Sequence, residues 1–212
     1  MKKNIAIIGS GFSSLSAACY LAKNGHNVTV FEKNEELGGR ARQFKAKGFT
    51  FDMGPSWYWM PDVFEKFFND FNKSTKDFYE IEKLNPAYRV YFGLDDYIDI
   101  EDSIEKISKK FEKIETGSGK KLKKFLERAK ENYGIGVTDM LYKMPGLSPL
   151  ELISYKTIKK IRYFLSTIRK EVHRDFKNPK LRSVLEFPVL FLGAKASNTP
   201  AFYNFMNYAD FG

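Results

Sequence analysis

Residues 5–41 read IAIIGSGFSSLSAACYLAKNGHNVTVFEKNEELGGRA, and this stretch decides the fold. Residues 4–8 are an apolar run bounded by glycine, which is typical of a strand in a parallel sheet covered on both faces. The next apolar residues share one face at helical spacing: Leu15, Ala18, Cys19 and Ala22. Asn24-Gly25 ends this helix, and residues 28–31 form a second strand. The order of strand, glycine turn, helix and strand predicts a right-handed α/β crossover unit.

The turn of this unit has the pattern G-x-G-x-x-S, which suits the binding of a diphosphate. Gly9 and Gly11 carry no side chain, so backbone N–H groups and a helix N-terminus can approach negative charge closely. Ser14 stands at the third position, where a small residue lets the helix lie against the strand, and its hydroxyl can bond back to a helix carbonyl. By itself the pattern also fits a tight structural turn.

An acidic residue follows the turn about twenty residues later, at the end of the second strand. This residue is Glu32, whose carboxylate can bind ribose hydroxyls and would repel the 2′-phosphate of NADP. The alternative is a solvated surface carboxylate. Taken together, the parts predict an adenine-dinucleotide site that contains Gly9, Gly11, Phe12, Ser13, Ser14, Glu32 and Lys33.

Two more motifs follow, LGGRA at residues 37–41 and FDMGPS at residues 51–56. The pair resembles the flavin-dependent amine oxidase and carotenoid desaturase superfamily, and the similarity is greatest to bacterial-type phytoene desaturases, through about residue 93. The resemblance implies FAD as the cofactor and a Rossmann-like FAD-binding domain of the amine-oxidase type. It also implies cofactor contacts from Gly38, Gly39, Arg40, Gly54, Pro55 and Ser56.

These added residues have plausible physical roles at a flavin site. A second glycine pair lets backbone approach the ribityl or diphosphate portion, and Arg40 can offset phosphate charge with directional donors. Gly54-Pro55 would shape a stiff turn near the flavin. Two plainer interpretations stay open, namely that Arg40 is an ordinary surface arginine and that Asp52 only caps a turn.

The resemblance also implies an activity, FAD-dependent desaturation of an apolar polyene such as phytoene in carotenoid biosynthesis. Alternatives are another flavin oxidoreductase of the superfamily, such as a carotenoid isomerase, ketolase or amine oxidase, or a non-enzymatic dinucleotide-binding remnant. Members of the family are more than twice as long as this chain. We therefore expect an N-terminal fragment with an incomplete FAD-binding domain, inactive by itself or completed by a C-terminal chain.

The rest of the chain changes in character as it proceeds. We expect a small hairpin over residues 44–51, a proline-initiated helix over 61–71, and strands over 88–92 and 97–100. Helical spacing then predominates, including an apolar stripe formed by Ile158, Ile161, Leu165, Ile168 and Val172. The predicted organisation is the N-terminal part of an FAD-binding domain at 1–92 and a mainly helical, partial substrate or membrane-associated domain at 93–212.

The excess positive charge is local. Net charge is +9 overall, and residues 156–182 hold ten Lys or Arg against two acids, which is +8. Together with the apolar stripe, this segment predicts peripheral contact with anionic lipid, in a cytoplasmic protein on the inner face of the membrane. A solvated helix face is the alternative. Nucleic acid is not expected, because no recognised nucleic-acid module surrounds the segment.

Other features limit the range of functions. A single cysteine, Cys19, excludes an internal disulfide framework and a cysteine-rich metal site, which favours a reducing interior. His26 and His173 lack zinc-like spacing, so no metal is expected. The WYWM cluster at residues 57–60 could line an apolar tunnel or face the flavin, or could simply be core. The aromatic tail at residues 202–212 suggests that the chain ends inside what would be a larger protein.

Overall fold

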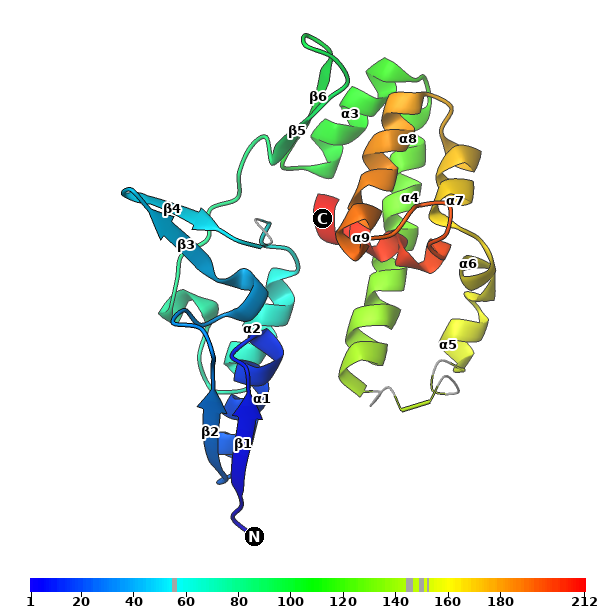
Figure 1. Ribbon diagram of the computed structural model, residues 1–212. Coiled ribbons are helices and arrows are strands. Elements are labelled where there is room, and N and C mark those ends of the chain that lie inside the picture. Colours follow the sequence, from blue (N-terminus) through cyan, green and yellow to red (C-terminus); the bar gives the residue numbers. More distant parts are fainter. Residues whose placement is uncertain (55–56, 144–146, 149–150, 152) are drawn as a thin grey trace. The chain divides into compact units, whose positions relative to one another are not determined.

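The computed structural model describes residues 1–54, 57–143, 147–148, 151 and 153–212. The chain divides into two compact units, Met1–Pro61 and Asp62–Gly212 (Figure 1). This division falls earlier than the change of domain predicted at residues 92 and 93, because the strand pair at residues 88–100 packs on the helical unit. The predicted limits of the cofactor and substrate domains stay a prediction.

The first unit begins with the expected strand–helix–strand order. Its elements are β1 (Asn4–Ile8), α1 (Phe12–Lys23) and β2 (Asn27–Phe31). The two strands are parallel and pair Ile5 with Val28 and Ile7 with Val30. The helix ends as predicted, with Gly25 in the left-handed region at φ 83°. The crossover unit predicted from the sequence is therefore confirmed.

The burial of this sheet differs from the prediction. Ile5 and Ile7 are half-buried on the face where α1 packs, whereas Ile8 is 88 % exposed and Phe31 57 % exposed. The expectation of a sheet covered on both faces is thus wrong for the described residues. The single helix packed on this strand pair covers only one face of the sheet. An apolar run in the sequence cannot reveal which elements are present to cover the other face.

The predicted hairpin is confirmed. Strands β3 (Gln43–Ala46) and β4 (Phe49–Asp52) are antiparallel, and Lys47-Gly48 at φ 50° and 82° forms the tight turn between them. A short helix, η1 (Gly39–Ala41), precedes the hairpin. After it, Trp57 and Tyr58 are exposed. Their proposed place in an apolar tunnel or at a flavin stays a prediction.

The second unit is mainly helical, with one strand pair. Helix α2 (Pro61–Asn69) crosses the division, and strands β5 (Tyr88–Tyr91) and β6 (Tyr97–Ile100) form the predicted antiparallel pair. The longer elements that follow are α3 (Ile104–Ile114), α4 (Ser118–Tyr133) and its π-helical continuation η3 (Gly134–Leu141). The remaining elements are η2 (Thr75–Asp77), α5 (Tyr155–Ile158), α6 (Ile161–Leu165), α7 (Ile168–Asp175), α8 (Pro179–Glu186), η5 (Phe187–Leu192), η6 (Ala201–Asn204) and α9 (Phe205–Phe211).

The core of this unit is built around aromatic contacts between helices. Phe176 meets Phe111 and Phe125 edge-to-face, with ring centroids 6.1 and 6.3 Å apart. The aromatic tail is also buried. Phe211 packs in the cluster that contains Phe176, whereas Phe202 packs in a second cluster with Tyr163 and Ala201. These tail residues therefore pack within the unit that contains them.

The predicted apolar stripe over residues 158–172 is interrupted. Ser166 is extended, and the Thr167 side chain accepts from the Lys170 N–H, so a new helix starts there. Ile168 and Val172 are buried by this helix, but Ile158, Ile161 and Leu165 are exposed on α5 and α6. The prediction of a continuous amphipathic stripe is therefore wrong. The Thr167 cap starts a new helix, whose apolar face does not continue that of the preceding helix.

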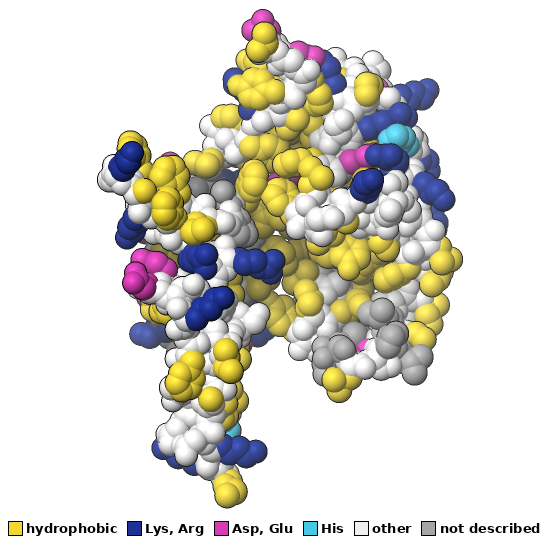
Figure 2. Space-filling model, viewed as in Figure 1, with side chains coloured by type: hydrophobic (Ala, Val, Ile, Leu, Met, Phe, Trp, Pro, Cys, Tyr) yellow, Lys and Arg dark blue, Asp and Glu magenta, His cyan; other side chains and the backbone are white. Residues whose placement is uncertain are grey.

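The basic segment is largely neutralised by acids from other elements. Beyond Glu171 and Asp175 within the segment, acids elsewhere pair with it: Lys156 with Asp139, Lys160 with Glu131, Arg169 with Glu186, and Lys180 with Asp96. Figure 2 shows an acidic side chain beside the histidine and basic side chains of this face. The local +8 therefore overstates the charge that this surface presents.

Candidate dinucleotide-binding site

The glycine turn lies between the carboxyl end of β1 and the first turn of α1. The Gly9 N–H donates to the Phe31 carbonyl at 2.7 Å, which ties the turn to β2. Gly11 precedes the helix, and within the described chain no side chain caps α1 and no acid lies in its first turn. The first amides of a helix without such a cap offer donors and partial positive charge to an anion.

The backbone of this turn has open space beside its two glycines. A Cβ atom placed on Gly9 or Gly11 would meet no described atom within 4 Å. Phe12 and Ser13 are exposed and Ser14 is half-buried at the start of α1. Ser14, the residue predicted at the third, small position of the motif, therefore lies in the first turn of the helix.

The second glycine pair is held directly against the turn. The Gly38 N–H donates to the Ser10 carbonyl at 3.0 Å, and Gly38 bridges to Gly11. A Cβ atom on Gly39, whose φ is 62°, would lie 3.0 Å from the Gly11 Cα atom. Backbone packs on backbone here, so the pair supports the turn by its lack of side chains.

The third glycine motif joins the same assembly. A Cβ atom on Gly54 would stand 1.9 Å from the Arg40 carbonyl oxygen, and the Met53 N–H donates to the Arg42 carbonyl at 3.0 Å. The structure thus brings three motifs, separated by about 45 residues of chain, into one backbone layer. Pro55 and Ser56, also predicted as contacts, lie outside the described residues.

Glu32 lies directly after β2, and its carboxylate is held by four donors. Ser10 donates its N–H and its Oγ–H to Oε2 at 2.8 and 2.7 Å. Asn34 donates its N–H and its Nδ2–H to Oε1 at 3.0 and 2.7 Å. These bonds, of which the Ser10 hydroxyl contributes most, lower the pKa of Glu32 from 4.5 to about 2.

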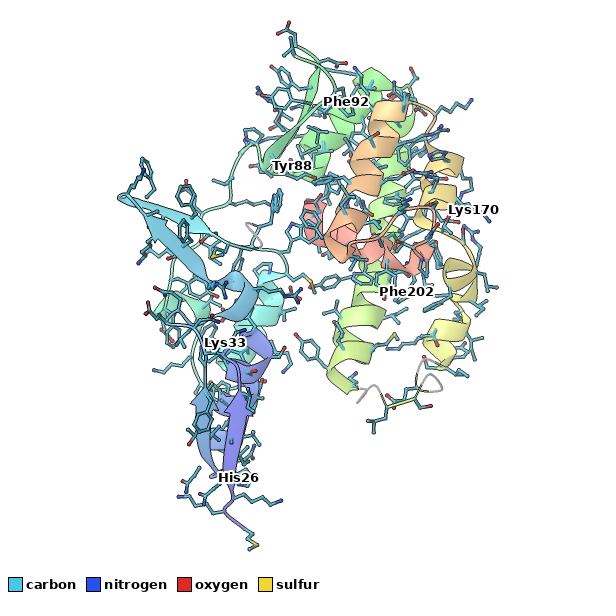
Figure 3. The ribbon with its side chains drawn as sticks, viewed as in Figure 1. His26, Lys33, Tyr88, Phe92, Lys170 and Phe202 are labelled. Atoms are coloured by element: carbon cyan, nitrogen blue, oxygen red, sulfur yellow. The ribbon has the colours of Figure 1, made fainter. Side chains whose placement is uncertain are left out.

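The sequence analysis did not identify Ser10 and Asn34 as site residues. The available signals were a serine between the two glycines and an asparagine two residues after the acid. The basic residues predicted for the site, Lys33 and Arg40, are both exposed. Figure 3 shows Lys33 just beyond β2, at the opposite end of the strand pair from His26. Asp52 accepts from the Gln43 side chain at 3.2 Å across the hairpin.

Comparisons with known proteins agree with this geometry. Residues 7–73 match the family model described as an NAD(P)-binding Rossmann-like domain. Over 99 % of its length, the chain is 37 % identical to a carotenoid 3,4-desaturase of Haloarcula japonica. It is also 32 % identical, over 94 % of its length, to a 4,4′-diapophytoene desaturase (4,4′-diaponeurosporene-forming) of Staphylococcus haemolyticus. Along nearly its whole length, the chain is therefore similar in sequence to these two desaturases.

The homology has a defined extent. The chain spans 43 % of the Haloarcula protein and 40 % of the Staphylococcus protein. Its fold resembles that of putrescine oxidase bound to putrescine, with a TM-score of 0.56 at 17 % identity over 97 % of this chain and 41 % of the other. A fatty acid isomerase from P. acnes gives a TM-score of 0.53, again at 17 % identity, over 98 % of this chain and 42 % of the other. At that identity the likeness shows a similar fold and nothing about function.

The chain therefore combines a dinucleotide-type turn with sequence similarity to proteins named as desaturases. Among the described residues, no cluster of His, Cys, Asp and Glu could hold a metal ion. Within the same residues, no helix is both long and apolar enough to cross a bilayer.

Proposed function

We propose that Met1–Pro61 binds FAD, with its diphosphate at the Gly9–Gly11 turn and its adenine ribose at Glu32. The observation that carries this proposal is the open space before both glycines, at the uncapped start of α1. FAD is favoured over NAD because of the two motifs that carry the flavoenzyme resemblance. The GG-R motif packs on the same turn, and the D-x-G motif packs on the GG-R motif. A carboxylate at Glu32 disfavours a 2′-phosphate.

The residues of the chain would bind and orient the cofactor. Bound FAD supplies a ring that can accept a hydride from carbon. Backbone N–H groups at the start of α1 would meet the phosphate oxygens, and Arg40 and Lys33 would add positive charge at the surface. Glu32 stays ionised at neutral pH and would accept from ribose hydroxyls.

Equilibrium dialysis of the 212-residue chain against FAD tests the cofactor. Gly11→Val is expected to weaken binding at least tenfold, since its side chain would occupy the open space needed by the diphosphate. Gly11 has φ −70°, so a side chain there brings no left-handed strain. Gly134→Ala is the control, because Gly134 also has helical φ and open surroundings but lies in the other unit. Unchanged FAD affinity in Gly11→Val would refute the site.

For the reaction, we propose that the whole protein desaturates an apolar polyene of carotenoid biosynthesis. The support is the identity of 37 % and 32 % to desaturases of such compounds. We further propose that turnover needs a segment equivalent to the part of the relatives that this chain does not cover. That segment would be supplied in the same chain or in another. Expression in a carotenoid-precursor-accumulating bacterium, with and without that segment, would show longer-wavelength pigments only when both are present. No pigment with both would argue against desaturation.

We also propose a peripheral contact with the cytoplasmic face of the membrane, made by α5 and α6. Four apolar side chains there are well exposed: Tyr155, Ile158, Ile161 and Leu165, the last at 78 %. Lys159 is exposed among them and can meet anionic headgroups while its stem covers apolar surface. Lys156 and Lys160 pair with Asp139 and Glu131. This surface is smaller than the stripe predicted from the sequence and carries less net charge.

Liposome flotation tests the membrane surface. The double variant Ile158→Ser, Leu165→Ser is expected to lower the bound fraction about tenfold, because two inserted aliphatic side chains are removed. Leu94→Ser is the matched control, since Leu94 is 97 % exposed but lies in the turn between β5 and β6. An equal loss of bound fraction in both variants would indicate non-specific hydrophobic binding and would contradict a specific surface on α5 and α6.

A further inference from the structure

The two oxygens of Glu32 have different partners. Ser10 supplies both donors to Oε2, and Asn34 supplies both donors to Oε1. An ionised carboxylate offers about four lone-pair sites, so the protein itself fills all of them. A ribose hydroxyl can reach this carboxylate only by replacing one of the four donors. The question is which donor can leave.

The donors differ in how easily they can be moved. Ser10 is 1 % exposed, and its peptide is held because its carbonyl accepts from the Gly38 N–H. Turning its hydroxyl away would leave a buried polar group without a partner, which is costly. Asn34 is exposed, so its side-chain amide can rotate into water and keep its hydrogen bonds there. Its backbone N–H stays with the chain. The Asn34 amide is therefore the displaceable donor.

We propose that Ser10 positions the Glu32 carboxylate for an adenine dinucleotide, and that the Asn34 side-chain amide holds the place of a ribose hydroxyl until that ligand binds. The inference rests on the proposed function, because it takes the ligand to carry a ribose with free hydroxyls. Ser10 acts through Glu32 and is a positioning residue. Asn34 competes with the ligand. A ligand without ribose hydroxyls has no donor with which to replace the amide.

The two variants Ser10→Ala and Asn34→Ala should change affinity in opposite directions. Ser10→Ala loses the fixed Oγ–H donor and is expected to weaken FAD binding about tenfold, the factor of one hydrogen bond to a charged group. Asn34→Ala removes the competing amide but keeps the backbone donor, and is expected to tighten FAD binding by a similar factor. Asn69→Ala, at an exposed asparagine that ends α2, is expected to change nothing.

The probes are FAD, ADP and 2′,3′-dideoxy-ADP, titrated into the full chain by calorimetry. The gain in Asn34→Ala should appear with FAD and ADP and vanish with the dideoxy nucleotide, because that probe brings no ribose hydroxyl. If Asn34→Ala weakens binding of ADP, the amide holds the ligand and does not compete with it. If neither variant changes affinity for ADP while the wild type binds, the inference fails and the cofactor site stands.

A measurement without ligand separates this inference from the proposed function. Carboxyl NMR can follow Glu32 in the free chain, where the Ser10 hydroxyl is the largest cause of its lowered pKa and the Asn34 amide the smallest. Ser10→Ala should raise the pKa of Glu32 clearly from about 2 toward 4.5, and Asn34→Ala should raise it less. Lys33, Glu35 and Glu36 on the same segment are exposed. An unchanged pKa in Ser10→Ala would overturn the positioning role, whether or not FAD binds.

Discussion

Glycines in the dinucleotide-binding unit serve two different purposes. At Gly11 the absent side chain leaves open space, with nothing described within 4 Å, whereas at Gly54 it allows contact with the Arg40 carbonyl. The first glycine is thus suited to a ligand and the second to the fold. Sequence motifs alone do not separate these purposes, because both appear simply as glycine in a conserved-looking pattern.

This distinction predicts opposite behaviour for two alanine variants. Gly54→Ala would place a methyl group 1.9 Å from a backbone oxygen, so we expect the first unit to lose about 2 kcal/mol or more of stability. Gly11→Ala should stay within about 0.5 kcal/mol of the wild type. Both tryptophans, Trp57 and Trp59, lie in this unit, so urea unfolding followed by tryptophan fluorescence measures the difference. Equal midpoints for the two variants would contradict the packing at Gly54.

Glu32 illustrates what a motif can and cannot indicate about a residue. Its position after the second strand was predicted, because the acid comes at a fixed distance from the glycine turn. Its hydrogen-bond partners were not predicted, because Ser10 and Asn34 contact it only as a result of how the turn and the loop fold. The identity of the acid is local information, and its surroundings depend on three-dimensional placement.

At the scale of elements, most strands and helices follow directly from the sequence pattern. The parallel strand pair and the hairpin at Lys47-Gly48 were both predicted from periodicity and turn residues. The break before α7 was not, because the Thr167 cap outweighs an apolar spacing that would otherwise continue. Ion pairs such as Lys180–Asp96 join residues far apart in the chain, so local charge counts missed them.

A contact between β5 and α9 gives the helical unit a dependence on pH. The Tyr88 hydroxyl donates to the Asp210 Oδ2 atom at 2.5 Å, and burial raises the pKa of Asp210 from 3.8 to about 6. Burial and the nearby Asp210 charge also raise the pKa of Tyr88. Because the folded state disfavours the charged carboxylate, the contribution of Asp210 is fully present below pH 3.8 and is lost as pH rises through about 6.

Asp210→Asn tests this dependence, since an amide oxygen can still accept from the Tyr88 hydroxyl without carrying charge. We expect the variant to be more stable than the wild type at pH 8, by up to about 3 kcal/mol, and close to it at pH 4. Urea unfolding followed by far-ultraviolet circular dichroism at the two pH values gives the comparison. A variant that is less stable than the wild type at pH 8 would show that the charged carboxylate stabilises the contact.

At the scale of the whole molecule, the buried core is distributed unevenly. Every fully buried apolar side chain among the described residues lies between Ile98 and Phe211. In the first unit, the only described residue in that burial class is the polar Ser10. Since buried apolar area supplies most of the free energy of folding, the two units should differ in stability. The unit with the dinucleotide-type site is then the one that a ligand can stabilise most.

We therefore predict two unfolding transitions. Tryptophan fluorescence reports the first unit and should change at lower urea concentration than circular dichroism, which reports mainly the helices of the second. A ligand that binds only the folded first unit adds about 2.7 kcal/mol at a concentration of 100 times its dissociation constant. FAD at that level should move the fluorescence transition to higher urea and leave the other unchanged. Leu122→Ala leaves a cavity in the helical core, so it should move the circular dichroism transition to lower urea and leave the fluorescence transition unchanged. Coincident transitions that FAD and Leu122→Ala shift together would mean that the two units fold as one.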